Sequence, residues 1–134
     1  MRDVPEGLKG VPGAQDLLDW FGDWPGFHDA EVISLHLNRR AASTLVVHTW
    51  RMTNEVDAKG YYVQDKHVVV EFSVSDVTDA ELSGFSHQNV VFGLTISKGE
   101  SGFTIDLDPS YGIGGTIVAR HISIKLHPGM ATDS

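Results

Sequence analysis

Hydrophobic residues recur at two different spacings along this chain. Between Ala14 and Phe21, the apolar residues Leu17, Leu18 and Phe21 follow helical spacing, and Gly22 provides a stop signal. This pattern predicts one short helix near the N-terminus. Most of the remaining chain alternates between apolar and polar residues, which is typical of strands that bury one face.

The alternation predicts two hairpins and two further strands. The first hairpin joins residues 31–40 to residues 43–51, and the second joins residues 88–96 to residues 102–108. The residues expected to share one face within each strand are, in chain order, Ile33, Leu35 and Leu37; Leu45 and Val47; Val68, Val70, Phe72 and Val74; Val90, Phe92, Leu94 and Ile96; Phe103, Ile105 and Leu107; and Val118, Ile122, Ile124 and Leu126.

Four segments lack this regularity. Residues 1–12 are predicted to form an extended lead-in, residues 52–65 a mobile loop and residues 128–134 a flexible tail, while residues 77–85 fit either a short edge strand or a helical turn. The whole chain, residues 1–134, is expected to form a single domain. Its predicted fold is mainly β (α+β): an antiparallel sheet of six to seven strands, curled into a sandwich or open barrel, with one short N-terminal helix.

The amino-acid composition limits the cellular compartment and the classes of binding partner that we expect. The chain of 134 residues has no cysteine, which excludes disulfide scaffolds, thiol nucleophiles and thiolate metal sites. The N-terminus lacks a signal-peptide pattern and no apolar run approaches the ~20 residues that span a bilayer, so we expect a cytoplasmic protein with no membrane partner. The net charge of −8 argues against direct binding of nucleic acid and favours a basic protein or a cation.

The segment WFGDWPGFHDAEV, residues 20–32, concentrates aromatic and acidic residues without periodicity. His28, Asp29 and Glu31 are residue types that bind divalent metals, and a His-x-x-Glu spacing would bring the outer two together on a helix. The segment instead follows a Pro-Gly turn and leads into a strand, where residues three apart point to opposite faces. We therefore favour a structural interpretation, in which hydrogen bonds fix the polar groups in a turn while the aromatic residues cover one end of the sheet.

Two pairs of histidines are weaker candidates for a site. His36 and His48 are expected on one face of the first hairpin, opposite each other or one diagonal step apart, but no clear third metal ligand accompanies them. His121 and His127 share a face of the last strand for the same reason of spacing. Half-buried or exposed histidines explain both pairs without a metal.

Three other motifs also have plain structural explanations. Ser86–His87 lacks the strained elbow that presents a nucleophilic serine. Asp106 and Asp108 alternate along a strand as paired glycosidase acids would, but an outward polar face gives the same pattern. The glycine-rich SYGIGG, residues 110–115, is followed by a strand and no lysine, which favours a tight turn over a phosphate site.

Three longer segments carry a resemblance to a known family. They are WPGFHDAEVISLHL at the first predicted strand, DVTDAELSGFSHQNVVFGLTI in mid-chain and DPSYGIGGTIVARHISI at the last strand. Together they resemble the landmarks of a family of small bacterial proteins named immunity protein 50, from about residue 20 to residue 126. The positions that match the family pattern are Trp24, Pro25, Phe27, His28, Asp29, Glu31, Gln88, Asn89, Tyr111 and Gly112.

The resemblance implies a non-enzymatic immunity protein that binds and neutralises a cognate toxin in competition between bacteria. The family supplies no cofactor, metal ligand or catalytic residue to carry over. The acidic charge would suit a toxin that is a basic nuclease. The candidate partner- or ligand-binding residues are Trp24, Phe27, His28, Asp29, Glu31, His87, Asn89 and Tyr111.

Two alternatives of other classes remain open from the sequence. A small metal- or ligand-dependent enzyme would use a pocket containing His28, Asp29 and Glu31, joined by His87 and Tyr111. A structural homo-oligomer, such as a homodimer, would pair an exposed sheet edge with its twin. Bound metal would favour the enzyme, and a concentration-dependent size would favour the oligomer.

Overall fold

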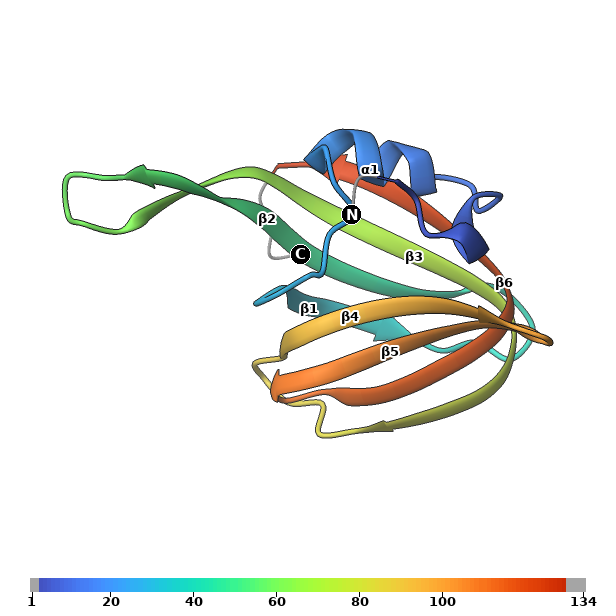
Figure 1. The fold of residues 1–134 in the computed structure, drawn as a ribbon. Coiled ribbons are helices and arrows are strands. Elements are labelled where there is room, and N and C mark those ends of the chain that lie inside the picture. The colour runs from blue at the N-terminus through green and yellow to red at the C-terminus, as the bar shows by residue number, and fades with distance from the viewer. Residues whose placement is uncertain (1–2, 130–134) are drawn as a thin grey trace.

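The computed structural model describes residues 3–129, except for the side chains of residues 52–54 and 62–64. Within that range the chain forms one sheet and a short helical region (Figure 1). The elements, in chain order, are η1 (Glu6–Leu8), α1 (Ala14–Phe21), β1 (Glu31–His36), β2 (Ser43–Val56), β3 (Tyr62–Ser83), β4 (Val90–Gly99), β5 (Gly102–Tyr111) and β6 (Gly114–Pro128).

All strand pairs are antiparallel, and the strand order is β1-β2-β3-β6-β5-β4. The sheet curls until its two outer strands meet, because Glu31 of β1 pairs with Val90 of β4. The predicted fold class is therefore confirmed as a mainly β, curled antiparallel sheet with one short helix. The two longest strands, β3 and β6, pair along most of their length and connect the two halves of the ring.

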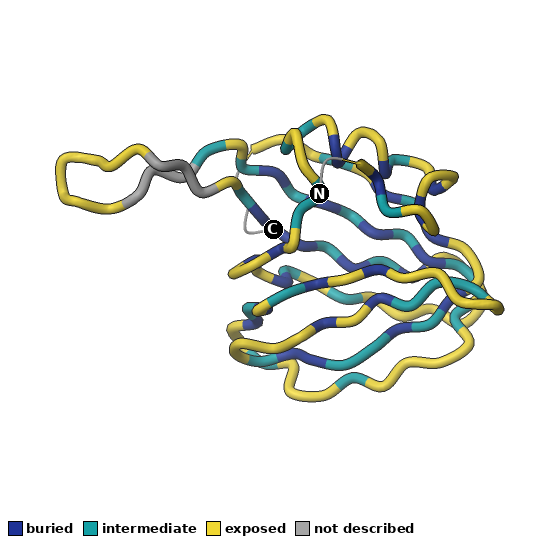
Figure 2. The backbone as a smooth tube through the Cα atoms, in the orientation of Figure 1, coloured by how far each residue is buried: buried dark blue, intermediate teal, exposed yellow. Residues whose placement is uncertain are grey.

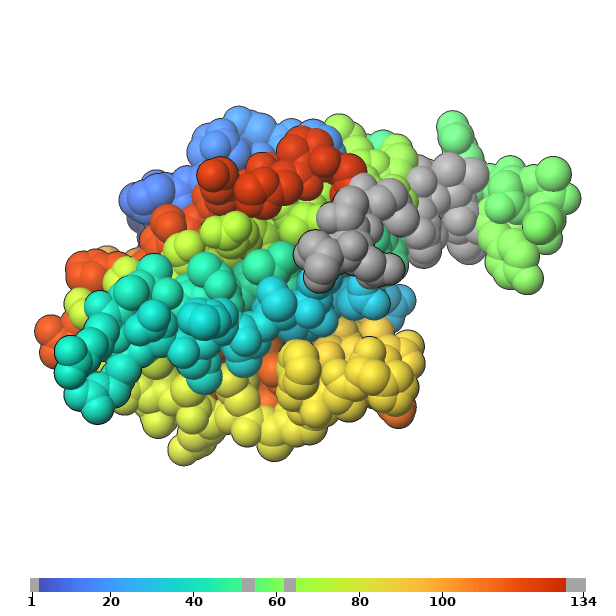
Figure 3. All heavy atoms as spheres, turned by 180° about the vertical axis from the view of Figure 1, so that it is seen from behind, coloured from blue at the N-terminus to red at the C-terminus, as the bar shows by residue number. Residues whose placement is uncertain are grey.

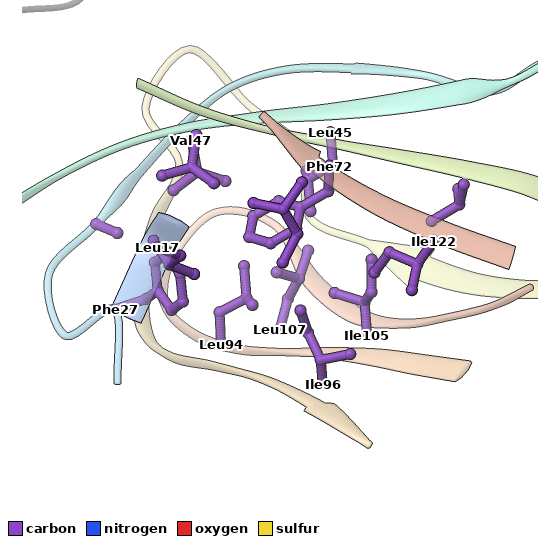
Figure 4. Close-up of a cluster of buried hydrophobic side chains, with 14 of the residues drawn as sticks. Leu17, Phe27, Leu45, Val47, Phe72, Leu94, Ile96, Ile105, Leu107 and Ile122 are labelled. Atoms are coloured by element: carbon purple, nitrogen blue, oxygen red, sulfur yellow. The ribbon is translucent and has the colours of Figure 1, made fainter. Parts of the chain in front are cut away.

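The helical region packs against the sheet, with α1 on β6 and η1 on β4. Gly22 ends α1 as predicted, because its left-handed backbone lets its N–H donate to Leu18 O at 2.7 Å. Leu17 is fully buried and points into the core beside Phe27 (Figure 4). Burial of such a side chain stabilises the fold by roughly 1.5–3 kcal/mol. Among the described residues, no helix is long and apolar enough to cross a membrane.

The N-terminal segment before α1 is part of the core rather than an extended lead-in. It contains the turn η1 and buries Val4, Leu8 and Val11. The segment is also tied directly to the sheet, because Ile124 N–H of β6 donates to Pro12 O at 2.8 Å. These three apolar positions have helical spacing, but the prolines and glycines between them favoured an irregular segment, so the sequence did not reveal their burial.

The inward faces of β3 and β5 follow the predicted alternation. The four predicted inward residues of β3 are almost completely buried, and those of β5 also face the core. In β1, however, a bulge at Ile33 changes the phase of the strand. Val32 and Leu35 both pair with inward residues of β2, namely Val47 and Leu45. The predicted grouping of Ile33 with Leu35 is therefore wrong, since a bulge places two residues opposite one.

In two further strands, β4 and β6, the inward-facing residues differ in part from those predicted. A bulge at Phe92 in β4 leaves that ring 58% exposed and turns Val91 into the core. In β6, Ile117 and Ala119 are buried in place of the predicted Val118. There the β3–β6 pair bends beside Asp76, whose φ is 56°. The inward-facing residues of β6 are odd-numbered up to Ala119 and even-numbered from Ile122 onward, where the prediction was correct.

The segment predicted as a mobile loop, residues 52–65, is a projecting two-stranded ribbon. β2 and β3 continue into it, and the turn between them spans residues 57–61 (Figure 1). The Asp57 carboxylate accepts hydrogen bonds from the N–H groups of Lys59 and Tyr61. The turn is solvent-exposed along its length (Figure 2), and Tyr61 is 69% exposed.

The two remaining irregular segments compare differently with their predictions. Residues 77–85, predicted as an edge strand or a helical turn, are strand up to Ser83, because β3 continues without interruption. Pro128 still belongs to β6, and Gly129 N–H donates to His67 O at 2.8 Å. The rest of the predicted tail, residues 130–134, lies outside the described residues.

Candidate functional site

The three segments that carry the family resemblance meet at one end of the sheet. They are the turn before β1, the β3–β4 loop and the β5–β6 turn. Backbone hydrogen bonds join the first two, because Val32 N–H donates to Asn89 O at 2.8 Å and Asp29 N–H donates to Val91 O at 3.0 Å. We call this region the convergent end.

The side chain of Asn89 fixes the convergent end from within. It is 4% exposed, and its Oδ1 accepts hydrogen bonds from Ser86 N–H at 2.9 Å and from Ile113 N–H at 3.1 Å. Its Nδ2 donates to Ser86 O at 2.8 Å. Asn89 therefore satisfies buried backbone groups of two different loops, which is a structural role.

The Phe27–Asp29 turn explains why the aromatic and polar residues of the first segment separate. Phe27 and Asp29 both have positive φ, 61° and 65°, and Ala30 N–H donates back to Phe27 O at 3.0 Å. The turn directs Phe27 into the core, where its ring lies edge-on to Phe72 with 5.8 Å between the centroids. Trp24 packs against the same core and is partly buried. The prediction that these aromatic residues cover one end of the sheet is confirmed.

His28 and Asp29 lie on the surface of this turn rather than in a buried network. Their side chains are 63% and 54% exposed. His28 Nδ1 lies 3.0 Å from Phe92 O, and a carbonyl oxygen only accepts, so Nδ1 carries the proton in this contact. Nε2 of the same ring lies 3.5 Å from Asp29 Oδ2. The expected hydrogen bond to the backbone is therefore present for His28, although both side chains are more than half exposed.

Exposed aromatic rings lie on the segments of the convergent end, and one of them contacts His28. The bulge in β4 presents Phe92, whose ring meets the His28 ring at 4.9 Å and 88°. Tyr111, which pairs with Val90 across β4 and β5, is 54% exposed, and Phe85 of the β3–β4 loop is 59% exposed. Large apolar rings that are exposed together typically mark a contact surface.

A groove of about 410 Å³ adjoins the convergent end. It lies between the turn before β1 and the base of the projecting ribbon, and its lining includes Trp24, His28 and Trp50. Arg51 closes one side, held by a two-point contact with Asp65 at 2.9 and 2.7 Å. Hydrogen bonds from Arg51 lower the pKa of the Asp65 carboxyl, so this pair stays charged at neutral pH.

The predicted metal or enzyme pocket does not assemble around His28. Glu31 pairs with His48 in the β1–β2 ladder, so it lies on the outer face of the sheet beside a different histidine. Within the described residues, no group of three or more His, Cys, Asp or Glu side chains is placed to hold a metal ion. His87 is exposed in the β3–β4 loop.

A pair of histidines that the sequence did not predict lies on the outer face of β2 and β3. His48 is 7% exposed, and its Nε2 lies 3.1 Å from Nδ1 of His67, with the two rings stacked at 5.2 Å. Trp50 packs against both rings. Burial, and to a lesser extent His67, lowers the pKa of His48. The register between β2 and β3 would have revealed this pair, because His48 pairs with Val69 and His67 is then its diagonal neighbour on the same face.

The expected proximity of His36 and His48 is not found. His36 pairs with Thr44, near the β1–β2 turn, and His48 pairs with Glu31 at the other end of β1. His121 and His127 each lie beside a different acid of β3, Asp76 and Glu71, at 3.7 and 3.3 Å.

The other predicted motifs have structural roles. Asp106 and Asp108 are exposed on β5 as an outward polar face. The Ser86 hydroxyl donates to Gln88 O within its own loop. Gly112 has a φ of 87° and lies against the β3–β4 loop, where a Cβ atom would approach Gln88 O to 2.4 Å. The expected tight glycine turn is therefore present.

Comparisons with known proteins bear on the identity of this fold. Neither the curated proteins nor the solved structures contain a significant match to the chain. A family model described as immunity protein 50 matches residues 13–127, which include β1 to β5, all of β6 except Pro128, and all three segments of the convergent end. The chain belongs to the immunity protein 50 family.

Proposed function

We propose that this protein binds a bacterial toxin domain and neutralises it by occupying a surface that the toxin needs, without catalysing a reaction. Family membership carries this proposal, because an immunity protein family implies a toxin partner. The absence of cysteine is compatible with action in the reducing cytoplasm, where we place the complex.

The convergent end is the surface that we assign to the toxin. The Asn89 side chain fixes two of its three segments and backbone hydrogen bonds fix the third, yet the surface presents Phe92 and Tyr111 to solvent. Exposed aromatic rings on a rigid support lose little conformational entropy on binding, and such rings are common energetic centres of interfaces. His28 and Asp29 add polar groups beside them, and Trp24 lines the adjoining groove.

The charge of the chain supports a basic toxin, such as a nuclease. A net charge of −8 accelerates encounter with a positively charged partner and disfavours direct contact with nucleic acid. An acidic protein bound over a basic active-site cleft would also exclude the phosphate backbone of the substrate.

The decisive experiment measures binding and inhibition of the toxin domain encoded beside this gene. Purified toxin domain is titrated with the parent chain and with Phe92→Ala and Tyr111→Ala, and each affinity is measured by calorimetry. Loss of a central aromatic ring is expected to cost about 2 kcal/mol, or roughly thirty-fold in Kd. His36→Ala, which removes an exposed ring near the opposite end of β1, is the matched control and should bind like the parent.

Each result has a defined meaning. Absence of toxin binding by the parent chain would refute the proposed function, whereas equal binding by all three variants would refute only the assignment of the surface. Thermal melting of each variant verifies that it is folded. Metal content and concentration-dependent size, measured on the same samples, test the enzyme and the homo-oligomer.

A further inference from the structure

The second half of β3 has one unpaired edge. β2 stops pairing with β3 at Val74, whereas β6 continues to pair with β3 as far as Ser83. Across residues 75–83, no strand of the described chain pairs with the side of β3 that faces away from β6. We call this side the free edge, and its nine residues extend over about 30 Å.

The free edge is uniformly acidic. Its sequence, SDVTDAELS, contains Asp76, Asp79 and Glu81 and no basic residue, and all three acids are exposed. A fourth acid extends the charge onto the sheet, because Glu81 and Asp106 pair with the same residue of β6, Thr116.

A shallow groove lies at the start of the free edge. It has a volume of about 270 Å³ and separates the β1–β2 connection from β3, with Leu37, Arg39 and Val77 in its lining. The space-filling view from behind shows the β1–β2 hairpin beside this part of β3 (Figure 3). Leu37 is 48% exposed there, which offers an apolar contact next to unpaired backbone groups.

We propose that the free edge binds an extended, basic segment of a partner protein, which adds to the sheet as a further strand beside β3. Added strands gain affinity from main-chain hydrogen bonds and specificity from alternate side chains. Basic side chains of the partner would lie opposite Asp79 and Glu81, and an apolar side chain would enter the groove beside Leu37. The proposal rests on the proposed function only for the identity of this partner as the toxin.

The acidic charge of the free edge favours a basic segment of a partner over a second copy of this chain as its occupant. Charged side chains on an edge normally prevent pairing with other strands. Two copies paired through the free edge would place three acids opposite another three, which is destabilising. A basic strand removes this repulsion and gains opposite-charge pairs, so the edge excludes its twin while remaining open to a basic partner.

The test uses a synthetic peptide, so it does not depend on the toxin. The probe is a nine-residue peptide of alternating lysine and valine, added to the full chain while backbone amide signals are followed by NMR. Saturable shifts and slowed hydrogen exchange, confined to residues 75–83 and the neighbouring part of β6, are the expected result. Shifts spread over the whole acidic surface would overturn the proposal.

Two control peptides separate strand addition from simple charge attraction. A peptide with alternate backbone nitrogens methylated keeps the charge but loses the hydrogen bonds, and a glutamate–valine peptide keeps the hydrogen bonds but reverses the charge. Neither should bind measurably. Binding of the methylated peptide as tightly as the parent peptide would overturn the proposal.

A matched pair of variants locates the site. Asp79→Lys/Glu81→Lys should weaken the lysine–valine peptide about ten-fold, because two cross-strand charge pairs are lost. Asp16→Lys/Asp19→Lys changes the net charge equally but lies on α1, on the other side of the molecule (Figure 1), and should weaken it far less. Equal weakening by both variants would overturn the proposal. If the peptide adds to β3 but the toxin does not bind, only the proposed function fails.

Discussion

Asn89 shows how a single side chain can hold the candidate binding surface together. Its amide satisfies two backbone N–H groups and one carbonyl from loops that are distant in sequence, and it is shielded from water. A buried polar group that loses its partner costs about 1–3 kcal/mol, because water cannot replace the lost bond.

Asn89→Ala is therefore expected to lower the free energy of unfolding by about 2–4 kcal/mol, since it strands Ser86 N–H and Ile113 N–H. Urea denaturation measures this loss. Asn38→Ala is the matched control, because Asn38 also accepts two backbone N–H bonds but lies in an exposed turn, where water substitutes. Equal losses in the two variants would contradict the role assigned to Asn89.

His48 makes the stability of the fold depend on pH. Burial lowers its pKa in the folded chain, whereas the unfolded chain retains a value of about 6.5. The unfolded state therefore binds the proton more readily, so stability is complete above about pH 6.5 and falls as the pH drops through that value toward the lower folded pKa.

Replacement of His48 by glutamine should remove this pH dependence. His48→Gln keeps a hydrogen-bonding group near His67 but does not titrate, so its stability should change less than that of the parent between pH 7.5 and pH 5.5. His36→Gln, at an exposed position of the same hairpin, should retain the parental profile. Urea midpoints at the two pH values provide the comparison, and an unaltered acid loss in His48→Gln would show that another group is responsible.

At the scale of elements, the turns decide which residues reach the surface. Gly112 and Gly60 have the same φ of 87°, but their surroundings differ. A Cβ atom at Gly112 would lie 2.4 Å from Gln88 O and 2.6 Å from Asn89 Oδ1, whereas a Cβ atom at Gly60 would meet no atom within 4 Å. The β5–β6 turn therefore requires glycine for space as well as for conformation.

Replacing each of these two glycines by alanine separates the requirement for a left-handed backbone from the requirement for space. Gly60→Ala should cost about 1–2 kcal/mol, which is the penalty of a left-handed backbone alone. Gly112→Ala should cost substantially more, because the added methyl group forces the β3–β4 loop away from the turn. Thermal and urea unfolding test the difference, and similar losses would mean that the two loops move apart without cost.

The elements themselves were largely predictable from the sequence, because α1 and the inward face of β3 follow regular periods. The phase errors occurred where a bulge intervenes, as at Ile33 and Phe92. A bulge depends on how two strands pair, so a single strand does not reveal it. This matters for the site, since the bulge in β4 exposes Phe92. The contact of His48 with His67 was missed because it depends on the register between β2 and β3, which neither strand reveals alone.

At the scale of the whole molecule, charge and shape act on different steps of recognition. The excess of acids is spread over the surface, with exposed carboxylates on α1, β3 and β5, whereas the exposed aromatic rings of Phe92 and Tyr111 lie together at the convergent end. Dispersed charge mainly accelerates encounter, and desolvated aromatic contacts mainly slow dissociation. The proposed complex should therefore show separable effects on its two rate constants.

Association with the toxin domain is expected to be sensitive to salt, while dissociation is not. Raising NaCl from about 50 mM to about 500 mM shortens the Debye length to a few ångströms and should slow association at least ten-fold. Asp106→Asn/Asp108→Asn, which reduces the net charge from −8 to −6, should associate more slowly than the parent at low salt and equally at high salt. Phe92→Ala should instead dissociate faster at either salt concentration. Surface plasmon resonance resolves both rate constants, and an association rate that does not change with salt would exclude electrostatic steering and remove the support for a basic toxin.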